Sequence, residues 1–137
     1  MGAILSEVAA LAAGPNFACL TTLMSDGTPV ASLMWIDADD DHLLLNTERH
    51  RLKYRNVSND PRVHVLIVDG EDPGHYCSVQ GLVKEHVLGR EAREHIEHLA
   101  EKYTGAAFEA RRIVSERVLL RVTPLRQRVR DSSVVVE

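Results

Sequence analysis

The sequence predicts a mainly β protein with inserted helices, an α+β domain whose six strands form a closed or nearly closed antiparallel barrel. Two observations lead to this prediction. Short runs of apolar and β-branched residues follow one another closely with turn residues between them, as in the successive hairpins of a small barrel. The chain is also 137 residues long and shows no repeat or linker, so residues 1–137 are expected to form a single domain.

The chain begins with a helix and a hairpin. Apolar residues recur at helical spacing over residues 4–13, and Gly-Pro-Asn at 14–16 ends this helix. Residues 17–23 and 29–36 are rich in apolar and β-branched side chains, which predicts two strands. The Ser-Asp-Gly turn at 25–27 joins them into a hairpin.

The middle of the chain places a third strand before a basic helix. Residues 37–41 are almost all acidic and predict a turn, and residues 42–46 follow as the strand. The helix ends at Asn-Asp-Pro, 59–61, because a proline pushes the residue before it out of the helical region. The apolar run 63–69 then predicts a buried fourth strand.

Two further strands complete the predicted barrel. Residues 76–85 form the fifth strand, and Gly81 in its middle indicates a β-bulge or the close approach of another backbone or a ligand. Residues 118–122 alternate in the way expected of a half-buried sixth strand. A small barrel fills its own interior with side chains, so a sizeable ligand is expected on its outside.

A long helix is predicted between these two strands. Apolar residues fall at three- and four-residue steps over residues 90–103, which is the clearest amphipathic pattern in the chain, and a glycine closes it at 105. A shorter helical piece is expected over residues 107–112. The tail, residues 131–137, is expected to be frayed.

Positive charge is concentrated in residues 46–63, NTERHRLKYRNVSNDPRV, in a chain with a formal net charge of -4. A helix that begins directly after a strand offers free backbone N–H groups that attract an anion, and basic side chains in its first turn oppose the helix dipole unless an anion lies there. The segment therefore predicts an anion site, with a solvated helix face as the alternative. Arg51 and Lys53 can reach one phosphate only from a turn that enters the helix.

Composition excludes several classes of function. The acidic balance and an aromatic content of 4% argue against a nucleic-acid-binding barrel and against a binder of anionic membranes. No apolar run approaches the ~20 residues of a membrane span, and no secretory signal is visible. Cys19 and Cys77 match no metal or redox spacing, so a reducing cytoplasm and a buried Cys19 thiol are expected.

Metal ligands and catalytic side chains are not evident. His95 and His98 lie among glutamates on the long helix, where charge pairs explain them without a metal, so no metal site is predicted. None of the common hydrolase, phosphate-loop or dinucleotide motifs occurs, and no catalytic residue is assigned. Trp35, the only tryptophan, is expected in the core or a dimer interface, with stacking on a planar cofactor as the alternative.

The order of these pieces resembles the split-barrel flavin-binding family typified by pyridoxamine 5'-phosphate oxidase. The likeness is carried by F-A-C-L-T-T-L-x-x-D-G-T-P-V-A-S from residue 17, by L-L-L-N-T from residue 43 and, most specifically, by R-x-K-x-R-N-x-x-x-D-P-R from Arg51 to Arg62. The chain is most similar to the branch whose members use the deazaflavin coenzyme F420. The resemblance implies a homodimeric split barrel, with each of two cofactors in a groove between the barrels.

The resemblance also implies the cofactor-binding residues. Arg51 and Lys53 would bind the cofactor phosphate, and Asn56 would help to hold that turn. Ser32, Leu33 and Met34 would line the planar ring. Asn46 and Thr47 would lie at the start of the phosphate pocket. Tyr76 and Ser78 would reach the cofactor bound mainly by the other chain.

Two departures from the family pattern favour coenzyme F420 over FMN. Pyridoxamine phosphate oxidases carry extra arginine and lysine on the strand that corresponds to residues 29–36, and they use a C-terminal arginine and tryptophan with the vitamin substrate. Here that strand has no basic residue, and Trp35 is the only tryptophan.

These implications together predict a homodimeric oxidoreductase that passes hydride from reduced coenzyme F420 to an electron-poor small-molecule acceptor. The cofactor supplies the chemistry, which explains why no catalytic triad is present. An FMN-dependent reductase or oxidase on the same scaffold and a non-enzymatic flavin-binding protein are the alternatives. Quinones, tetrapyrroles and unsaturated ketones are the candidate acceptor classes.

Overall fold

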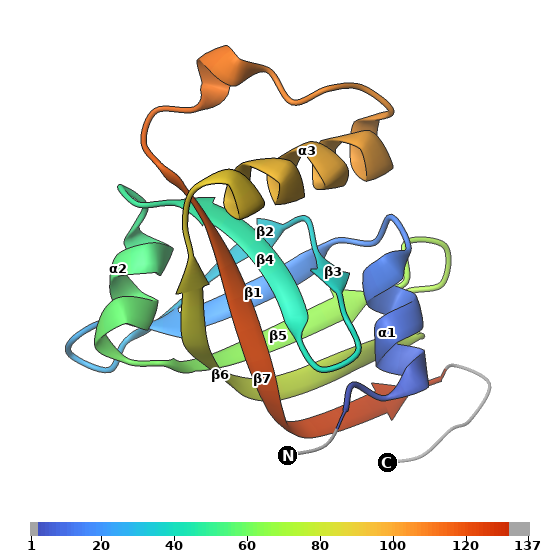
Figure 1. Ribbon diagram of the computed structural model, residues 1–137. Helices are drawn as coiled ribbons and strands as arrows, with labels where there is room; N and C mark the ends of the chain where they lie inside the picture. Colours follow the sequence, from blue (N-terminus) through green and yellow to red (C-terminus); the bar gives the residue numbers. More distant parts are fainter. Residues whose placement is uncertain (1–2, 132–137) are drawn as a thin grey trace.

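A computed structural model describes residues 3–131 and shows one curled antiparallel sheet surrounded by helices (Figure 1). The sheet has seven strands in the order β2-β1-β5-β6-β7-β4-β3. The strands are β1 Ala18–Leu23, β2 Pro29–Met34, β3 Asp37–Ala38, β4 Leu43–Glu48, β5 Arg62–Val68, β6 Tyr76–Val87 and β7 Arg117–Arg130. Each neighbouring pair is antiparallel, so the predicted α+β class and antiparallel split barrel are confirmed.

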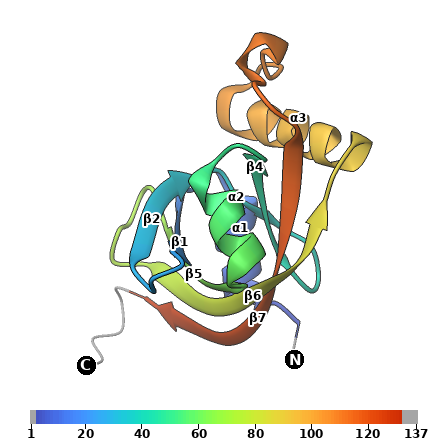
Figure 2. The same cartoon turned by 90° about the vertical axis from the view of Figure 1, so that its left-hand side faces the viewer.

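Within residues 3–131, three α-helices and one 3-10 helix accompany the sheet. They are α1 Ser6–Ala13, α2 Leu52–Asn59, α3 Arg90–Thr104 and η1 Ala110–Arg112. Figures 1 and 2 show α1 and α2 at opposite ends of the curl, whereas α3 lies outside it over β4 and β7. No helix within residues 3–131 is long and apolar enough to cross a membrane. The tail expected to be frayed lies, from residue 132 on, outside the described residues.

The sequence predicts six strands and the structure has seven, because the acidic turn at 37–41 contains the short strand β3. Its two residues pair with the start of β4. The carboxylate of Asp39 then accepts hydrogen bonds from the backbone N–H groups of Asp41 and His42, over 2.8 and 2.7 Å. These bonds close the turn tightly enough for two residues to pair before it.

The bulge predicted at Gly81 is confirmed by a register shift between Gln80 and Gly81 in the β6–β7 pair. A Cβ atom at Gly81 would lie 2.6 Å from Cγ1 of Val122 and 2.8 Å from the carbonyl oxygen of Thr123, so β7 passes too close for a side chain. Gly81 pairs with Pro124 in this irregular stretch. Because the bulge accommodates the proline, β7 continues well beyond the predicted residue 122.

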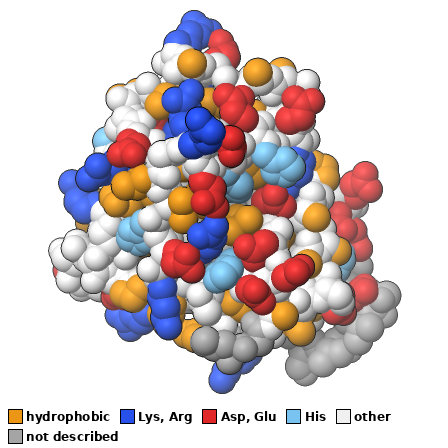
Figure 3. Space-filling model, in the orientation of Figure 1, with side chains coloured by type: hydrophobic (Ala, Val, Ile, Leu, Met, Phe, Trp, Pro, Cys, Tyr) orange, Lys and Arg blue, Asp and Glu red, His pale blue; other side chains and the backbone are white. Residues whose placement is uncertain are grey.

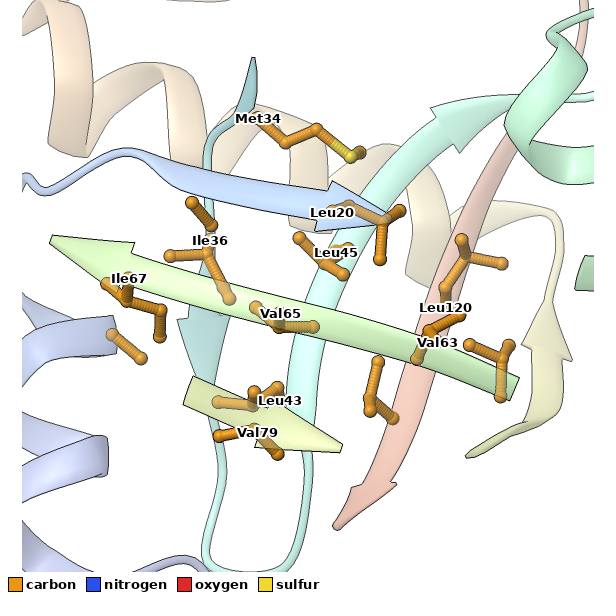
Figure 4. Close-up of a cluster of buried hydrophobic side chains, with 14 of the residues drawn as sticks. Leu20, Met34, Ile36, Leu43, Leu45, Val63, Val65, Ile67, Val79 and Leu120 are labelled. Atoms are coloured by element: carbon orange, nitrogen blue, oxygen red, sulfur yellow. The ribbon is translucent and has the colours of Figure 1, made fainter. Parts of the chain in front are cut away.

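The inside of the curl is filled by apolar side chains from alternate strand positions. Figure 4 shows Leu20, Leu45 and Val65 pointing toward one another within this cluster, and all three are buried. Cys77 belongs to the same core, whereas Cys19, which was expected to be buried, is half-exposed. Its strand neighbours Ala18 and Leu20 point inward, which leaves Cys19 on the outer face of the sheet.

A second apolar layer lies outside the sheet, beneath α3. The predicted apolar stripe of the helix consists of Ala92, Ile96, Leu99 and Tyr103; the first three are buried there, and Tyr103 is half-buried. The far end of the helix is fastened by Lys102, whose Nζ donates a hydrogen bond to the carbonyl of Ala12 over 2.8 Å. Gly105 follows with φ 73, the left-handed conformation that ends many helices and that favours glycine. α3 is therefore held in one position over β4 and β7.

Candidate functional site

A pocket of about 350 Å³ opens on the outside of the sheet, between β2, β4, the start of α2, α3 and the segment 105–116. This volume lies within the range of small-molecule sites, roughly 300–1,000 Å³. One side of the pocket is an apolar wall, made of Phe17, Leu33, Met34, Trp35, Ile96 and Leu99. A planar apolar ring can be held against such a wall.

The other side of the pocket is strongly cationic. It carries four basic side chains and one carboxylate, namely Arg51, Lys53, Arg112, Arg117 and Glu48. Figure 3 shows basic side chains at the upper tip of the molecule, over the segment between α3 and β7, where Arg111 and Arg112 are exposed. The excess of positive charge makes this side of the pocket a candidate anion site.

The entry to α2 brings Arg51 and Lys53 to one pocket. The helix begins at Leu52, and Arg51 is its N-cap residue, with an extended backbone at φ -75 and ψ 147. Lys53 is the second residue of the helix. Arg51 thus lies in the turn that enters the helix, which is the arrangement that the sequence requires for both side chains to reach one anion.

Neither of these two side chains is neutralised by a carboxylate within residues 3–131. Burial lowers the pKa of the half-buried Lys53 ammonium, and the positive charges of Arg51 and Arg117 lower it further. Like charges that are brought together without a counter-ion repel one another. A bound anion would relieve that repulsion.

Glu48 and Arg117 form a buried ion pair across β4 and β7, where they are directly opposite residues. Nη1 of Arg117 lies 3.3 Å from Oε1 of Glu48, with side chains only 9% and 3% exposed. The other oxygen of Glu48 accepts hydrogen bonds from the backbone N–H groups of Val114 and Ser115, both over 2.7 Å. Burial alone would raise the pKa of Glu48, but these bonds and the charge of Arg117 outweigh it and lower the pKa.

The pocket contains six of the ten cofactor-binding residues that the resemblance implies: Leu33, Met34, Asn46, Thr47, Arg51 and Lys53. Ser32 is half-buried on β2 but does not line the pocket. Asn56 is buried, and its Nδ2 donates to Oγ1 of Thr22 over 3.0 Å. This bond ties α2 to β1, in keeping with a role in holding the turn.

Tyr76 and Ser78 lie away from the pocket, on β6, three strands from β2 in the sheet. Both are half-buried and alternate along β6 with the inward-pointing Cys77 and Val79, so they face the outside of the sheet. The structure of a single chain therefore leaves their proposed contact with the cofactor of another chain as a prediction.

Three residues that line the pocket, Phe108, Arg112 and Arg117, are not predicted as site residues from the sequence. Arg117 carries a detectable signal, because strand alternation puts residue 117 on the same face as Leu119, beneath the long helix. Phe108 and Arg112 come from the irregular segment 105–116, where no periodic pattern indicates which side chains face the sheet.

Within residues 3–131, no group of three or more histidine, cysteine, aspartate or glutamate side chains is placed to hold a metal ion. The two helical histidines are engaged separately. His98 Nε2 lies 3.0 Å from a carboxylate oxygen of Asp37, and His95 Nδ1 lies 3.0 Å from Nδ2 of Asn46. Burial lowers the pKa of His95 to about 4, so its ring is neutral near pH 7.

Comparison with known proteins gives a family match over almost the whole chain. The family model described as Pyridoxamine 5'-phosphate oxidase matches residues 4–131. Among proteins of curated function, none matches the sequence.

Solved structures share the fold. One described as an F420 reductase is 29% identical, with a TM-score of 0.78, over 87% of this chain and 94% of that chain. A conserved hypothetical protein from Mycobacterium tuberculosis is 27% identical, with a TM-score of 0.76, over 95% of this chain and 87% of that one. General Stress Protein 26 from Bacillus anthracis is 21% identical, with a TM-score of 0.67, over 90% of this chain and 91% of the other, and it shows the fold alone.

Proposed function

Because this chain belongs to the pyridoxamine 5'-phosphate oxidase family, we propose that it is an oxidoreductase with a flavin-type cofactor in the pocket. More specifically, we propose that it uses reduced coenzyme F420 to transfer a hydride to an electron-poor small-molecule acceptor. The observation that carries the proposal is the pocket, in which the unneutralised cations Arg51 and Lys53 lie beside an apolar wall. A phosphorylated cofactor with a planar ring needs both features.

The residues of the pocket fit such a cofactor. Arg51 and Lys53 would hold the phosphate through charge-assisted hydrogen bonds. Leu33, Met34 and Trp35 would hold the ring and keep water from it. When bound, the deazaflavin supplies the hydride chemistry, so the chain's own residues need only bind, orient and shield.

Two observations favour coenzyme F420. The structure described as an F420 reductase has 29% identity over 87% of this chain. In addition, β2, which reads PVASLM, offers no basic side chain to a flavin phosphate. FMN is the second candidate, because the matching family is that of pyridoxamine 5'-phosphate oxidase, the type member of the flavin-binding split barrels that the sequence resembles.

We also propose that the working unit is a homodimer with the cofactor at the interface. Support comes from apolar side chains exposed beside the pocket, where Leu33 is 73% and Phe17 is 53% exposed. Leu33 begins a cross-strand row on the outer face that continues through Cys19 and Leu66 to Ser78. A second copy covering this row would bring Ser78 of one chain toward the pocket of the other.

The direct test is hydride transfer in a purified system. The protein should catalyse the oxidation of reduced coenzyme F420 by at least one of the candidate acceptors, a quinone, a tetrapyrrole or an unsaturated ketone, with one acceptor molecule reduced for each cofactor oxidised. The Lys53→Ala variant should be slower at low cofactor concentration, because its cofactor site is weakened. Tight cofactor binding with no turnover of any acceptor would instead support a non-enzymatic flavin-binding protein.

A further inference from the structure

Arg117 is the most deeply buried of the four cations that line the pocket. It is 8% exposed, whereas Arg51 and Arg112 are exposed and Lys53 is half-buried. Removing a guanidinium from water is costly unless its N–H groups find acceptors. The partners of the Arg117 N–H groups therefore indicate the role of this side chain.

Two of its three nitrogen atoms have partners in the protein. Nε donates a hydrogen bond to Oδ1 of Asn46 over 2.8 Å, and Nη1 lies 3.3 Å from Oε1 of Glu48. Within the described part of the chain, Nη2 has no hydrogen-bond acceptor. Among the described residues, the only fully buried side-chain polar atoms without a partner are His42 Nδ1 and His95 Nε2. Arg117 Nη2, which also has no partner, is therefore not fully buried.

The ring of Phe108 further restricts access to the guanidinium. Cζ of Arg117 lies 5.3 Å from the centre of that ring, and Cζ of Arg112 lies 5.4 Å from it. Phe108 thus covers one face of the Arg117 guanidinium through a cation–π contact. The Nη2 edge is what the group can still present to a ligand in the pocket.

Asn46 is held so that its oxygen faces Arg117. Its Nδ2 donates to the carbonyl oxygen of Ala92 over 2.9 Å and lies 3.0 Å from Nδ1 of His95. A carbonyl oxygen can only accept, so the NH₂ group must face α3 and the amide oxygen must face the guanidinium. Both hydrogen atoms of Nδ2 are then used inside the protein, which leaves Asn46 no donor for a ligand.

The neighbouring carboxylate does not cancel this site. One oxygen of Glu48 faces Arg117, and the other accepts the two backbone N–H groups of Val114 and Ser115. The negative charge of Glu48 is therefore compensated by groups of the protein, while the positive charges of Arg51 and Lys53 stay unpaired in the same pocket.

We propose that Arg117 is a third anion-binding residue of the pocket, beside Arg51 and Lys53, and that Asn46 is a positioning residue that aims its guanidinium at the ligand. The inference rests on the proposed function for its ligand, a phosphorylated flavin or deazaflavin, and assigns Arg117 to the phosphate. It also changes the role of Asn46, which acts through Arg117 rather than by touching the cofactor.

The test compares ligands with and without the phosphate. Dissociation constants are measured for coenzyme F420 and its phosphate-free deazaflavin chromophore, and for FMN and riboflavin. Arg117→Ala should weaken binding of the phosphorylated ligand by about 10- to 150-fold and leave the phosphate-free ligand unchanged, the range for one charge-assisted hydrogen bond. Arg55→Ala is the matched control, because it removes one positive charge from an exposed position of α2 outside the pocket.

Two more variants separate positioning from folding. Arg117→Lys keeps a charge opposite Glu48 and should stay folded while losing part of the phosphate preference. Asn46→Ala should lose phosphate preference in the native background but lose nothing more in the Arg117→Ala background. Equal weakening of both ligands by Asn46→Ala would mean a merely structural role and would overturn this part of the inference.

The outcomes also distinguish this inference from the proposed function. Native protein that binds none of the four ligands would refute both. Native protein that prefers the phosphorylated ligands, with a preference that Arg117→Ala and Arg117→Lys leave intact, would refute the role of Arg117 alone.

Discussion

The indole ring of Trp35 lies parallel to the phenol ring of Tyr103, with ring centroids 5.2 Å apart and planes inclined by 7°. Tyr103 comes from the end of α3 and Trp35 follows β2, so the stack joins the helix to an edge strand of the sheet. Phe17 packs against the same tyrosine at 5.8 Å and 45°. The aromatic part of the pocket wall is therefore held by the protein's own contacts.

This arrangement makes Trp35 a reporter of ligand binding. It is the only tryptophan and it lines the pocket, so coenzyme F420 or FMN bound there should quench its fluorescence. The titration curve should match that obtained from ligand fluorescence. Trp35→Phe should abolish the protein signal while the ligand signal persists. Ligand binding with unchanged Trp35 emission would place the cofactor elsewhere.

Removing either cation at the start of α2 should weaken cofactor binding. Arg51→Ala and Lys53→Ala should each cost about 1.5–3 kcal/mol of binding free energy, the range for a hydrogen bond to a charged group. Isothermal titration with the phosphorylated cofactor measures the loss. Arg55→Ala, on the same helix but outside the pocket, should change affinity little. Unchanged affinity in both pocket variants would return the segment to a solvated helix face.

The buried His95 should make the protein lose stability in acid. Burial lowers its pKa from 6.5 to about 4 in the folded state, so between those values the unfolded chain binds a proton that the folded chain does not. The free energy of unfolding should therefore fall as the pH drops from about 6.5 to about 4, by about 2–3 kcal/mol from this group.

His95→Gln tests the assignment, because glutamine keeps a hydrogen-bond acceptor for Asn46 and carries no charge. Urea unfolding of both proteins at several pH values isolates the contribution of His95 from that of other groups. The variant should show a flatter dependence over this interval. Parallel curves for the two proteins would mean that His95 is not the group responsible.

Gly81→Ala should destabilise the fold at the β6–β7 bulge. The added Cβ would lie 2.8 Å from a backbone oxygen of β7, which cannot move aside as a side chain can. Overpacking of this kind costs about 1–3 kcal/mol. Gly70→Ala is the matched control, because its Cβ would meet only the side chain of Asn16, at 3.6 Å. Thermal unfolding of the two variants should separate them clearly.

The sequence predicts the cationic part of the site at the start of α2 because the residues that form it are close together in the chain. Arg51 and Lys53 lie two residues apart at the entry to one helix, so chain geometry alone brings both side chains to one pocket. The same holds for the strands and for α3, whose apolar residues follow the period of each element. The bulge at Gly81 is predicted for a similar reason, since a glycine inside a strand pattern requires an explanation.

The remainder of the site depends on contacts between distant segments. Arg117 is 71 residues from Asn46, and only the pairing of β7 with β4 brings them together. Phe108 reaches the pocket through an irregular segment with no repeating pattern. The resemblance implies that Asn46 lies at the pocket, where it is found, but its hydrogen bonds to α3 depend on the packing of α3 on β4. Strand β3 escapes prediction because two residues are too few to show alternation.

On this proposal, the pocket binds a deazaflavin in preference to a flavin. The most direct measurement is a side-by-side titration of the purified protein with coenzyme F420 and with FMN, followed by ligand fluorescence and by the emission of Trp35. Tight binding of coenzyme F420 with weak binding of FMN is the predicted result. A clear preference for FMN, or binding of neither ligand, would contradict it.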